Sequence, residues 1–437
     1  MLIDFSFSNY RSFKDEQSFS MTRDTRFSDG EFGKQSTITA VYGPNASGKS
    51  NFLKALWTMA TLVRTSYSQG DATTSIPRDP FLLRSNARGI ESMFFADFLA
   101  SDGQRYQYWF RCDDKTILHE ELSLFRIIGD RLSTHSTRLF SRNGSDVDFG
   151  GSFRGPKAQV RKTIELRPNS LVLSAAAAAG IECTHAAFEF FSSGIAYCDA
   201  MGFSDEQPLI ISEFNRNTRF STHLQQLIRY ADFGIDSIRS APVNTDPIML
   251  DSFKEQLKTQ LGADSEKLDQ LFDAPAATEL RFEHRGETTA QFGVQNESQG
   301  TLAALSFFSL ALRQLARPTV TLIDEIDTSL HPTLVEEFIR LFTDPETNPH
   351  GSQIIFTTHD ASLINTSGAE DRLIGPDQVW LVEKTASGDS ELYPVTDLNV
   401  RREENIGKNY LNGIYGAIPK PSFHMMFARI MEEDDAS

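Results

Sequence analysis

The chain has 437 residues, of which 40% are hydrophobic and 23% charged, and its formal net charge is −17. This composition is typical of a globular protein with room for two or three domains. Its apolar stretches fall short of the roughly 18 residues that a transmembrane helix needs, and the N-terminus has no basic-then-apolar signal. We therefore expect a cytoplasmic protein with no membrane partner. The acidic charge argues against a protein that coats nucleic acid over its whole surface, but is compatible with a local basic groove.

Three cysteines are too few for a disulfide framework, which agrees with a reducing compartment. Cys183, His185 and Cys198 could be combined into a metal site, but they lack the paired C-x-x-C spacing of zinc ligands. We interpret these cysteines as buried or free thiols.

Residues 1–150 are expected to form the N-terminal segment of the main domain, hereafter the head. Ile3, Phe5 and Phe7 alternate as in a half-buried strand. A second strand is predicted at 36–43, followed by a helix over 52–63 and by a hairpin over 92–111 that turns at Asp102-Gly103. The segment 141–156 is rich in Gly, Ser and Asn, so we expect a loop or domain junction there.

The remaining chain divides into a mainly helical insertion, 151–275, and a C-terminal segment of the head, 276–437. The insertion contains helical patterns that include 220–231 and 249–262. In the last third, a helix over 302–316 precedes an apolar strand, an amphipathic helix and a second buried strand over 320–358. This βαβ order implies parallel strands. A closing hairpin is predicted over 378–395.

The segment GPNASGKS, 43–50, matches the phosphate-binding pattern G-x-x-x-x-G-K-[ST]. It lies between a predicted strand and a predicted helix, where backbone N–H groups and the helix dipole attract phosphate. Lys49 is expected to reach the β- and γ-phosphates, and the Ser50 hydroxyl to bind Mg²⁺. The pattern therefore predicts ATP with Mg²⁺ as the cofactors.

The segment TLIDEID, 321–327, supplies the acidic partners of this loop. Asp324 ends an apolar strand and is expected to hold Mg²⁺ through water, while Glu325 can polarise the attacking water as a general base. His359 stands in TTHD at the end of the next strand, where open α/β sheets place ligand-contacting residues. Together these residues predict an ATPase.

The segment NESQGT, 296–301, precedes the predicted helix over 302–316 and has two interpretations. In the first, Ser298 is an ordinary helix N-cap and Gly300 eases the turn. In the second, the exposed N–H groups at the same helix start bind phosphate. Because the loop and the acidic strand already account for one face of a nucleotide, we expect this second anion site to serve the ATP of another subunit.

These motifs, in this order, resemble the ABC-type ATPase heads of the RecF, SMC and OLD proteins. More narrowly, ESQGT, DEIDTSLHP, QIIFTTHD, QVWLVEK and NYLNGIYGAIP are similar to a prokaryotic group of AAA-family ATPases. That group includes the RloA and AbiL-type abortive-infection ATPases and, more distantly, the PARIS component AriA. The resemblance implies an α/β P-loop NTPase fold, an ABC-type head with a mixed sheet and an antiparallel β lobe, carrying a mainly helical insertion.

The resemblance also implies a homodimer, or a higher homo-oligomer, with two ATP molecules sandwiched between subunits. Residues 329–332 would be the D-loop and His359 the switch histidine, while the Q-loop candidates are Gln69 and 79–84. The signature loop would be residues 297–300, which read Glu-Ser-Gln-Gly where the family has Leu-Ser-Gly-Gly. A second departure from the family pattern is His331, which replaces the usual aspartate of the D-loop. The implied nucleotide contacts are Arg11, Gly43, Pro44, Asn45, Ala46, Ser47, Gly48, Lys49, Ser50 and Asn51, with Ser298, Gln299 and Gly300 contacting the partner's ATP.

By the same resemblance, the chain would act with a separately encoded effector, such as an RloB-like or Toprim nuclease. Too few residues follow His359 for an OLD-type nuclease domain. The leading hypothesis is an ATP-dependent switch in antiviral defence, with DNA or a phage-derived molecule as candidate trigger. The alternative is a RecF-like or SMC-like DNA repair or clamp ATPase, against which the acidity and the short insertion argue. A nucleotide-binding scaffold without hydrolysis is disfavoured by Glu325.

Overall fold

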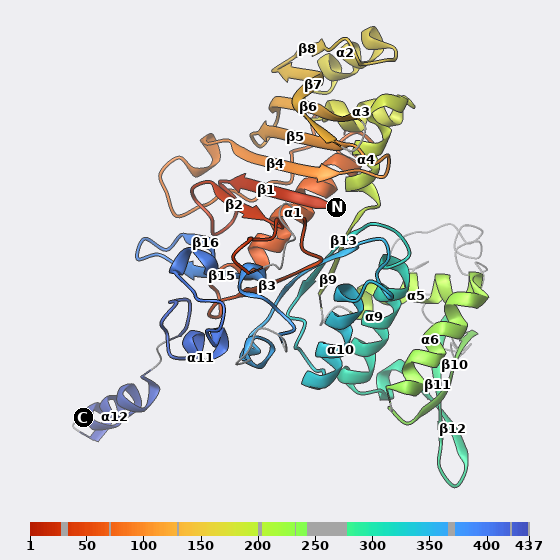
Figure 1. Ribbon diagram of the computed structural model, residues 1–437, viewed down its shortest axis with the longest axis vertical. Helices are drawn as coiled ribbons and strands as arrows, with labels where there is room; N and C mark the ends of the chain where they lie inside the picture. Colours follow the sequence, from red (N-terminus) through yellow and green to blue (C-terminus); the bar gives the residue numbers. More distant parts are fainter. Residues whose placement is uncertain are drawn as a thin grey trace, which may run out of the picture. The chain divides into compact units, whose positions relative to one another are not determined.

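The computed structural model describes residues 1–27, 34–69, 71–128, 131–199, 203–231, 233–242, 278–365, 372–419 and 422–435. The chain forms two compact units (Figure 1). Unit 1 comprises Met1–Cys198, Gln314–Asp327 and Glu336–Ser437, and unit 2 comprises Asp199–Arg313 and Thr328–Val335. This division differs from the three consecutive segments expected from the sequence, since 151–198 belongs to unit 1. Within the described residues, no helix is long and apolar enough to cross a membrane.

A six-stranded mixed sheet forms the centre of unit 1, in the order β16-β15-β3-β14-β13-β9. β3 pairs in parallel with β14 and β15, and β14 pairs in parallel with β13, as the βαβ pattern predicted. All residues of β3, β13 and β14 are buried, which is typical of parallel strands covered on both faces. The bounds are β3 Ile38–Tyr42, β9 Ile195–Asp199, β13 Val320–Asp324, β14 Gln353–Thr357, β15 Val379–Lys384 and β16 Ser390–Pro394.

The helices of unit 1 bury apolar faces at helical spacing. In α1, Phe52, Leu56, Met59 and Val63 all lie in the core, as the periodicity predicted. The bounds are α1 Lys49–Thr65, α2 Lys157–Leu166, α3 Val172–Ala178, α4 His185–Ser192, α11 Ile406–Leu411 and α12 Phe423–Asp435. α10, Pro332–Thr343, begins in unit 2 and ends in unit 1.

A seven-stranded sheet in the order β2-β1-β4-β5-β6-β7-β8 forms the antiparallel lobe of unit 1. Alternate residues of its strands, such as Phe5 and Phe94, are fully buried in the core. The expected loop over 141–156 is wrong in its first half: Gly144-Ser145 makes a hairpin turn between β7 and β8, and Gly144 takes φ 60°. The bounds are β1 Leu2–Ser8, β2 Gln17–Ser20, β4 Ser92–Leu99, β5 Arg105–Cys112, β6 Ile117–Ile128, β7 Arg131–Asn143 and β8 Asp146–Phe149.

Unit 2 packs helices against a three-stranded antiparallel sheet, β10-β11-β12. Its core includes Leu224 and Ile228 of α6, Leu280 and Phe282 of β11, and Leu305 of α9. Strands β9 and β10 occupy some of the stretch that we expected to be mainly helical, while the predicted helix over 249–262 lies outside the described residues. The bounds are α5 Phe203–Arg216, α6 Thr218–Tyr230, α9 Gln299–Gln314, β10 Ile235–Pro242, β11 Thr278–Arg285 and β12 Thr289–Gly293.

A buried charged pair joins the antiparallel lobe to α3. The side chains of Glu120 and Arg142 are both fully buried, with 3.9 Å between Oε2 and Nη1. The Glu120 carboxylate accepts hydrogen bonds from the backbone N–H groups of Val172 and Leu173, the first residues of α3, and from the Tyr108 hydroxyl. Arg142 donates to three main-chain carbonyls. Burial raises the pKa of Glu120 and lowers that of Arg142, so each group depends on its partners.

We predict that Glu120→Ala lowers the free energy of unfolding by about 3–5 kcal/mol, because it leaves Arg142 buried without its counter-charge. The matched control is Glu91→Ala, which removes the acid of an exposed pair with Arg111, and should cost at most about 1 kcal/mol. Urea unfolding followed by circular dichroism measures both. Equal losses in the two variants would contradict the role given to Glu120.

Candidate functional site

The phosphate-binding pattern lies at the end of β3 and opens α1, as the sequence predicted. Gly48 adopts φ 119°, and a Cβ there would lie 2.6 Å from the Ser390 hydroxyl and 2.7 Å from the Ser12 hydroxyl. Only glycine fits this conformation and this close approach. The Ser47 hydroxyl is buried within the loop and has no hydrogen-bond partner. The loop is therefore tightly held from two sides while keeping a polar atom for a ligand.

Lys49 is the buried cation of this loop. Its ammonium donates to the carbonyl oxygens of Gly43 at 2.9 Å and Pro44 at 3.2 Å, and lies 3.1 Å from His359 Nε2. Burial lowers the pKa of Lys49, and the carboxylates of Asp324 and Glu325 oppose that shift. Burial and the Lys49 charge likewise lower the pKa of His359, so the imidazole is neutral at pH 7 and can accept the Lys49 proton in a hydrogen bond.

Asp324 stands directly beside the loop. Its Oδ1 accepts hydrogen bonds from the Ser50 hydroxyl at 3.0 Å and the Thr357 hydroxyl at 2.7 Å. Its Oδ2 accepts from the Tyr197 hydroxyl at 3.3 Å. Ser50 and Asp324 are the two residues from which a Mg²⁺ site was predicted, and the fold brings them into direct contact.

Glu325 follows Asp324 in a strained backbone conformation, with φ 55° for a residue that is not glycine. Its N–H donates to the Thr357 hydroxyl at 2.7 Å, which fixes this turn. Asp327 accepts from the backbone N–H of His359 at 3.3 Å, and its other oxygen is buried without a partner. Hydrogen bonds thus hold both acidic residues and His359 at the ends of β13 and β14.

Lys49, Glu325 and His359 border one cavity of about 380 Å³, hereafter the nucleotide cavity. Its volume lies within the roughly 300–1,000 Å³ of small-molecule pockets. It is lined by Ser12, Asn45, Ala46, Ser47, Gly48, Lys49, Ser50, Asn51, Glu325, His359 and Lys384. Backbone N–H groups at a helix start and a buried lysine fit a phosphate chain, and a hydroxyl beside a carboxylate fits Mg²⁺. The residues present therefore fit ATP with Mg²⁺.

Arg11, predicted as a nucleotide contact, does not line the nucleotide cavity. Its guanidinium pairs with Asp79, with Nε 2.9 Å and Nη2 2.8 Å from Oδ2. The next residue, Ser12, faces the cavity instead and accepts a hydrogen bond from Asn51 at 2.9 Å. Gln69, one Q-loop candidate, borders a different hollow beside Ile76 and Asn169. The other Q-loop candidate is the segment 79–84, whose first residue, Asp79, pairs with Arg11.

The predicted signature and D-loop residues belong to unit 2, whereas the nucleotide cavity belongs to unit 1. The Ser298 hydroxyl accepts from the backbone N–H of Thr301 at 3.1 Å, so Ser298 caps α9 as the first interpretation predicted. A Cβ at Gly300 would lie 2.7 Å from the Ser329 carbonyl oxygen. The signature and the D-loop therefore pack together, and only glycine allows that approach.

Three residues of the site were not singled out from the sequence. Ser12 follows Arg11, which was a predicted nucleotide contact, and Lys384 ends QVWLVEK, one of the segments that resemble the family. Tyr197 lies on β9, in a stretch expected to be helical. Nothing in the sequence around it indicates a role in the site, because its contact with Asp324 depends on β9 lying beside β13. Pairing between distant segments brings all three to the site.

Comparison with solved structures finds similar chains at low identity. A crystal structure titled as the SmcHead bound to the C-winged helix domain of ScpA has a TM-score of 0.44 and 14% identity, covering 90% of this chain and 97% of that one. A structure of the recombination mediator protein RecF with ATP has a TM-score of 0.40 and 12% identity, covering 90% and 97%. No curated protein matches the chain.

The family comparison covers more than half of the chain. The model described as "AAA domain, putative AbiEii toxin, Type IV TA system" matches residues 38–365, from the first residue of β3 to just beyond His359. The match therefore contains the phosphate-binding loop and the signature. It also contains Asp324, Glu325 and His359. The chain belongs to this AAA-domain family of ATPases.

Proposed function

We propose that this protein binds and hydrolyses ATP and that its nucleotide state switches a separately encoded effector in antiviral defence. The observation that carries the proposal is the nucleotide cavity, where the phosphate-binding loop, Asp324, Glu325 and His359 meet. Among the described residues, no cluster of His, Cys, Asp or Glu offers a second metal-dependent catalytic centre. An ATPase without a further catalytic centre is expected to act through another protein.

The residues of the cavity have separate roles in this proposal. Lys49 would release its hydrogen bonds to the Gly43 and Pro44 carbonyls and bind the β- and γ-phosphates. Ser50 and Asp324 would hold Mg²⁺, which supplies charge neutralisation at the phosphates when bound. Glu325, held by the Thr357 hydroxyl, would accept the proton of the attacking water. His359 would contact the γ-phosphate.

The second half of the site would come from another copy of the chain. Ser298, Gln299 and Gly300 would present the N–H groups of the α9 start to the partner's γ-phosphate. The contact between Gly300 and the Ser329 carbonyl would link that signature to the D-loop, so both would move as one body. ATP would thereby assemble a homodimer, and hydrolysis would release it.

A defence role is supported by two independent resemblances. The family description names a putative AbiEii toxin of a type IV toxin–antitoxin system. The motifs NYLNGIYGAIP and DEIDTSLHP resemble the RloA and AbiL-type abortive-infection ATPases. Those ATPases act with a separate effector, so we place this chain in the same arrangement, with an RloB-like or Toprim nuclease as the expected class of effector.

Helix α12 offers a surface for that effector. Its exposed apolar side chains include Phe423, Met426, Phe427, Ile430 and Met431, at spacings of i, i+3, i+4, i+7 and i+8. This stripe is the pattern of a helix that lies in an apolar groove of another protein. Residues 432–435 are all acidic. We therefore propose that the effector presents an apolar groove with a basic rim at one end.

We predict that Glu325→Gln retains ATP and lowers turnover by about 10²-fold or more, because the proton acceptor is lost while the phosphate contacts stay. Lys49→Ala should instead lose ATP binding. Equilibrium binding of a labelled ATP analogue and phosphate release measure the two effects. The control is Glu337→Gln, which changes an exposed acid of α10 and should behave as the unmodified protein. Normal hydrolysis by the Glu325 variant would show that the base lies elsewhere.

We predict that Ser298→Arg spares ATP binding by the monomer and abolishes ATP-driven dimerisation and hydrolysis. The large cation would obstruct the signature surface, whereas the nucleotide cavity lies in the other unit. Sedimentation of the Glu325→Gln protein with and without Ser298→Arg reports the dimer directly. Thr288→Arg places the same side chain on an exposed turn of unit 2 and is the matched control. A dimer that persists in the Ser298 variant would refute the shared site.

We predict that the product of an adjacent gene co-purifies with this protein and that ATP changes the yield at least about tenfold, since a switch needs a differential affinity of that order. Phe427→Glu should abolish co-purification and leave ATP hydrolysis intact; Leu166→Glu, on the exposed side of α2, is the control. An equal yield of the partner with and without ATP would contradict the switch. Hydrolysis stimulated by DNA, with no protein partner, would favour the DNA-clamp alternative.

A further inference from the structure

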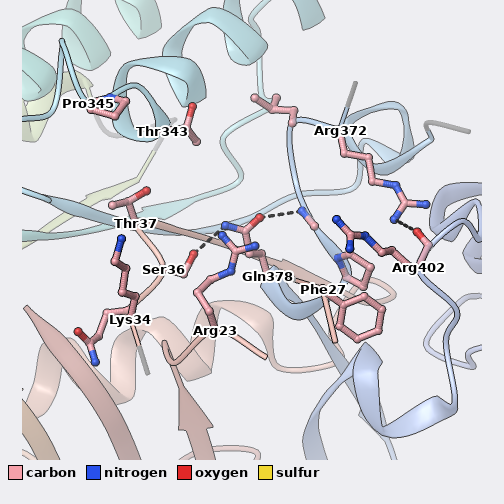
Figure 2. A pocket seen from close by; sticks show the side chains of 14 residues that line it. Arg23, Phe27, Lys34, Ser36, Thr37, Thr343, Pro345, Arg372, Gln378 and Arg402 are labelled. Atoms are coloured by element: carbon pink, nitrogen blue, oxygen red, sulfur yellow. Dashed lines mark hydrogen bonds between the residues drawn. The ribbon is translucent and has the colours of Figure 1, made fainter. Parts of the chain in front are cut away.

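A second cavity of about 430 Å³ lies in unit 1, away from the nucleotide cavity. We call it the cation pocket, because the cations Arg23, Lys34, Arg372 and Arg402 all line it (Figure 2). The described residues that line the pocket include no Asp or Glu. In a chain with a net charge of −17, a cavity whose charged lining residues, among those described, are all positive is unexpected.

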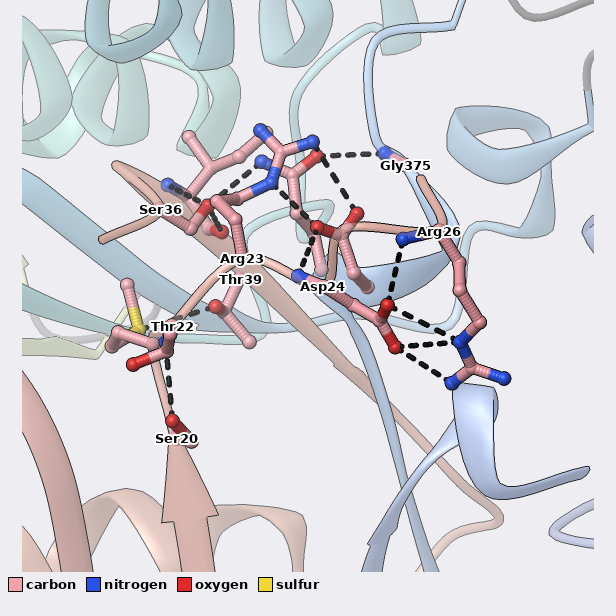
Figure 3. A network of polar contacts seen from close by, with 12 residues as sticks. Ser20, Thr22, Arg23, Asp24, Arg26, Ser36, Thr39 and Gly375 are labelled. Atoms are coloured by element: carbon pink, nitrogen blue, oxygen red, sulfur yellow. Dashed lines mark hydrogen bonds and ion pairs between the residues drawn. The ribbon is translucent and has the colours of Figure 1, made fainter. Parts of the chain in front are cut away.

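Buried hydrogen bonds hold the walls of this pocket. Arg23 donates from Nε to Asp377 Oδ2 at 2.6 Å and from Nη2 to Oδ1 at 3.3 Å, and the Asp377 side chain is only 1% exposed. Gln378 donates to the Ser36 hydroxyl at 2.7 Å and accepts from the Gly375 N–H at 2.7 Å (Figure 3). These contacts fix the wall before any ligand arrives.

Arg372 is also held in position, by hydrogen bonds to main-chain carbonyls. Its Nη1 donates to the carbonyl oxygen of Arg402 at 2.6 Å, and its Nη2 donates to that of Glu404. A guanidinium carries five N–H groups, so these two bonds leave three donors. Burial lowers the pKa of Arg372, which means that the cation has lost hydration that an anion could replace.

We propose that the cation pocket is a binding site for a phosphorylated small molecule, distinct from the ATP of the nucleotide cavity. Arginines in fixed positions bind phosphate through paired N–H groups, and Lys34 adds a compact charge. Phe27, whose ring lies against the Arg26 guanidinium, adds an apolar wall to the same pocket. A volume of about 430 Å³ accommodates a ligand of nucleotide size.

The location separates this site from the ATPase chemistry. Ser36 and Thr37 directly precede β3, and Gln378 directly precedes β15. β3 and β15 run in parallel, with Ala40 opposite Val379, so the cation pocket lies where both strands begin. The nucleotide cavity lies where both strands end, at the phosphate-binding loop and Lys384. Sheet geometry therefore places the two anion sites at opposite edges.

The test uses the full chain with Lys49→Ala, so that the nucleotide cavity no longer competes for the probe. The probe is inorganic pyrophosphate, titrated calorimetrically. We expect saturable binding, weakened about tenfold or more by the double change Lys34→Gln and Arg402→Gln, because each lost charge-assisted contact contributes to affinity. The charge-preserving pair Lys34→Arg and Arg402→Lys should lose less affinity than the double glutamine variant, because it keeps both positive charges while giving up the paired N–H groups of Arg402.

The matched control is Arg111→Gln, which removes an exposed arginine that pairs with Glu91 and does not line the pocket. Absence of pyrophosphate binding, or the same loss in the Arg111 variant, would overturn the proposal. A labelled single-stranded oligonucleotide that binds through Lys34 and Arg402 and resists displacement by pyrophosphate would also overturn it, in favour of nucleic acid. The assay requires no ATP hydrolysis, so its failure is distinguishable from failure of the proposed switch.

Discussion

The buried carboxylate of Asp324 holds together the elements that build the nucleotide cavity. One of its oxygens accepts from the hydroxyls of Ser50, on α1, and Thr357, at the end of β14, while the other accepts from Tyr197 on β9. The Thr357 oxygen in turn accepts from the N–H of Glu325. The strained turn that aims Glu325 is therefore fixed by the same carboxylate that would hold Mg²⁺. In the proposed mechanism, metal binding and orientation of the base would be coupled through one side chain.

A second set of contacts connects this cavity to the C-terminal segment. Glu383, beside the cavity residue Lys384, accepts from the N–H of Ala417 at 2.7 Å and from the Tyr393 hydroxyl at 3.1 Å. Tyr410 of α11 packs against Tyr42, the last residue of β3 before the phosphate-binding loop, with 5.4 Å between ring centroids. The segment that leads to α12 thus touches both strands that end at the nucleotide.

The sequence was most informative where function resides in consecutive residues. The loop from Gly43 to Ser50, and Asp324 at the end of an apolar strand, were predicted because each motif specifies its own local backbone. Tyr197 could not be predicted, since its role depends on β9 pairing with β13, and the surrounding residues have no helical or strand period that singles it out. Arg11 was placed at the nucleotide by resemblance, but the partner that takes it, Asp79, lies far along the chain.

The cation pocket could not be foreseen for the same reason. Its cations come from three separate segments, and none of them forms a basic run in the sequence. They converge because β3 and β15 are neighbours in a parallel sheet, so the residues that precede the two strands meet at one edge. Parallel pairing likewise brings the residues that follow the strands together at the opposite edge, where Lys384 joins the phosphate-binding loop. One pair of strands thereby sets the position of both proposed anion sites. A ligand that shifted either strand along its axis would therefore also move the residues of the other site.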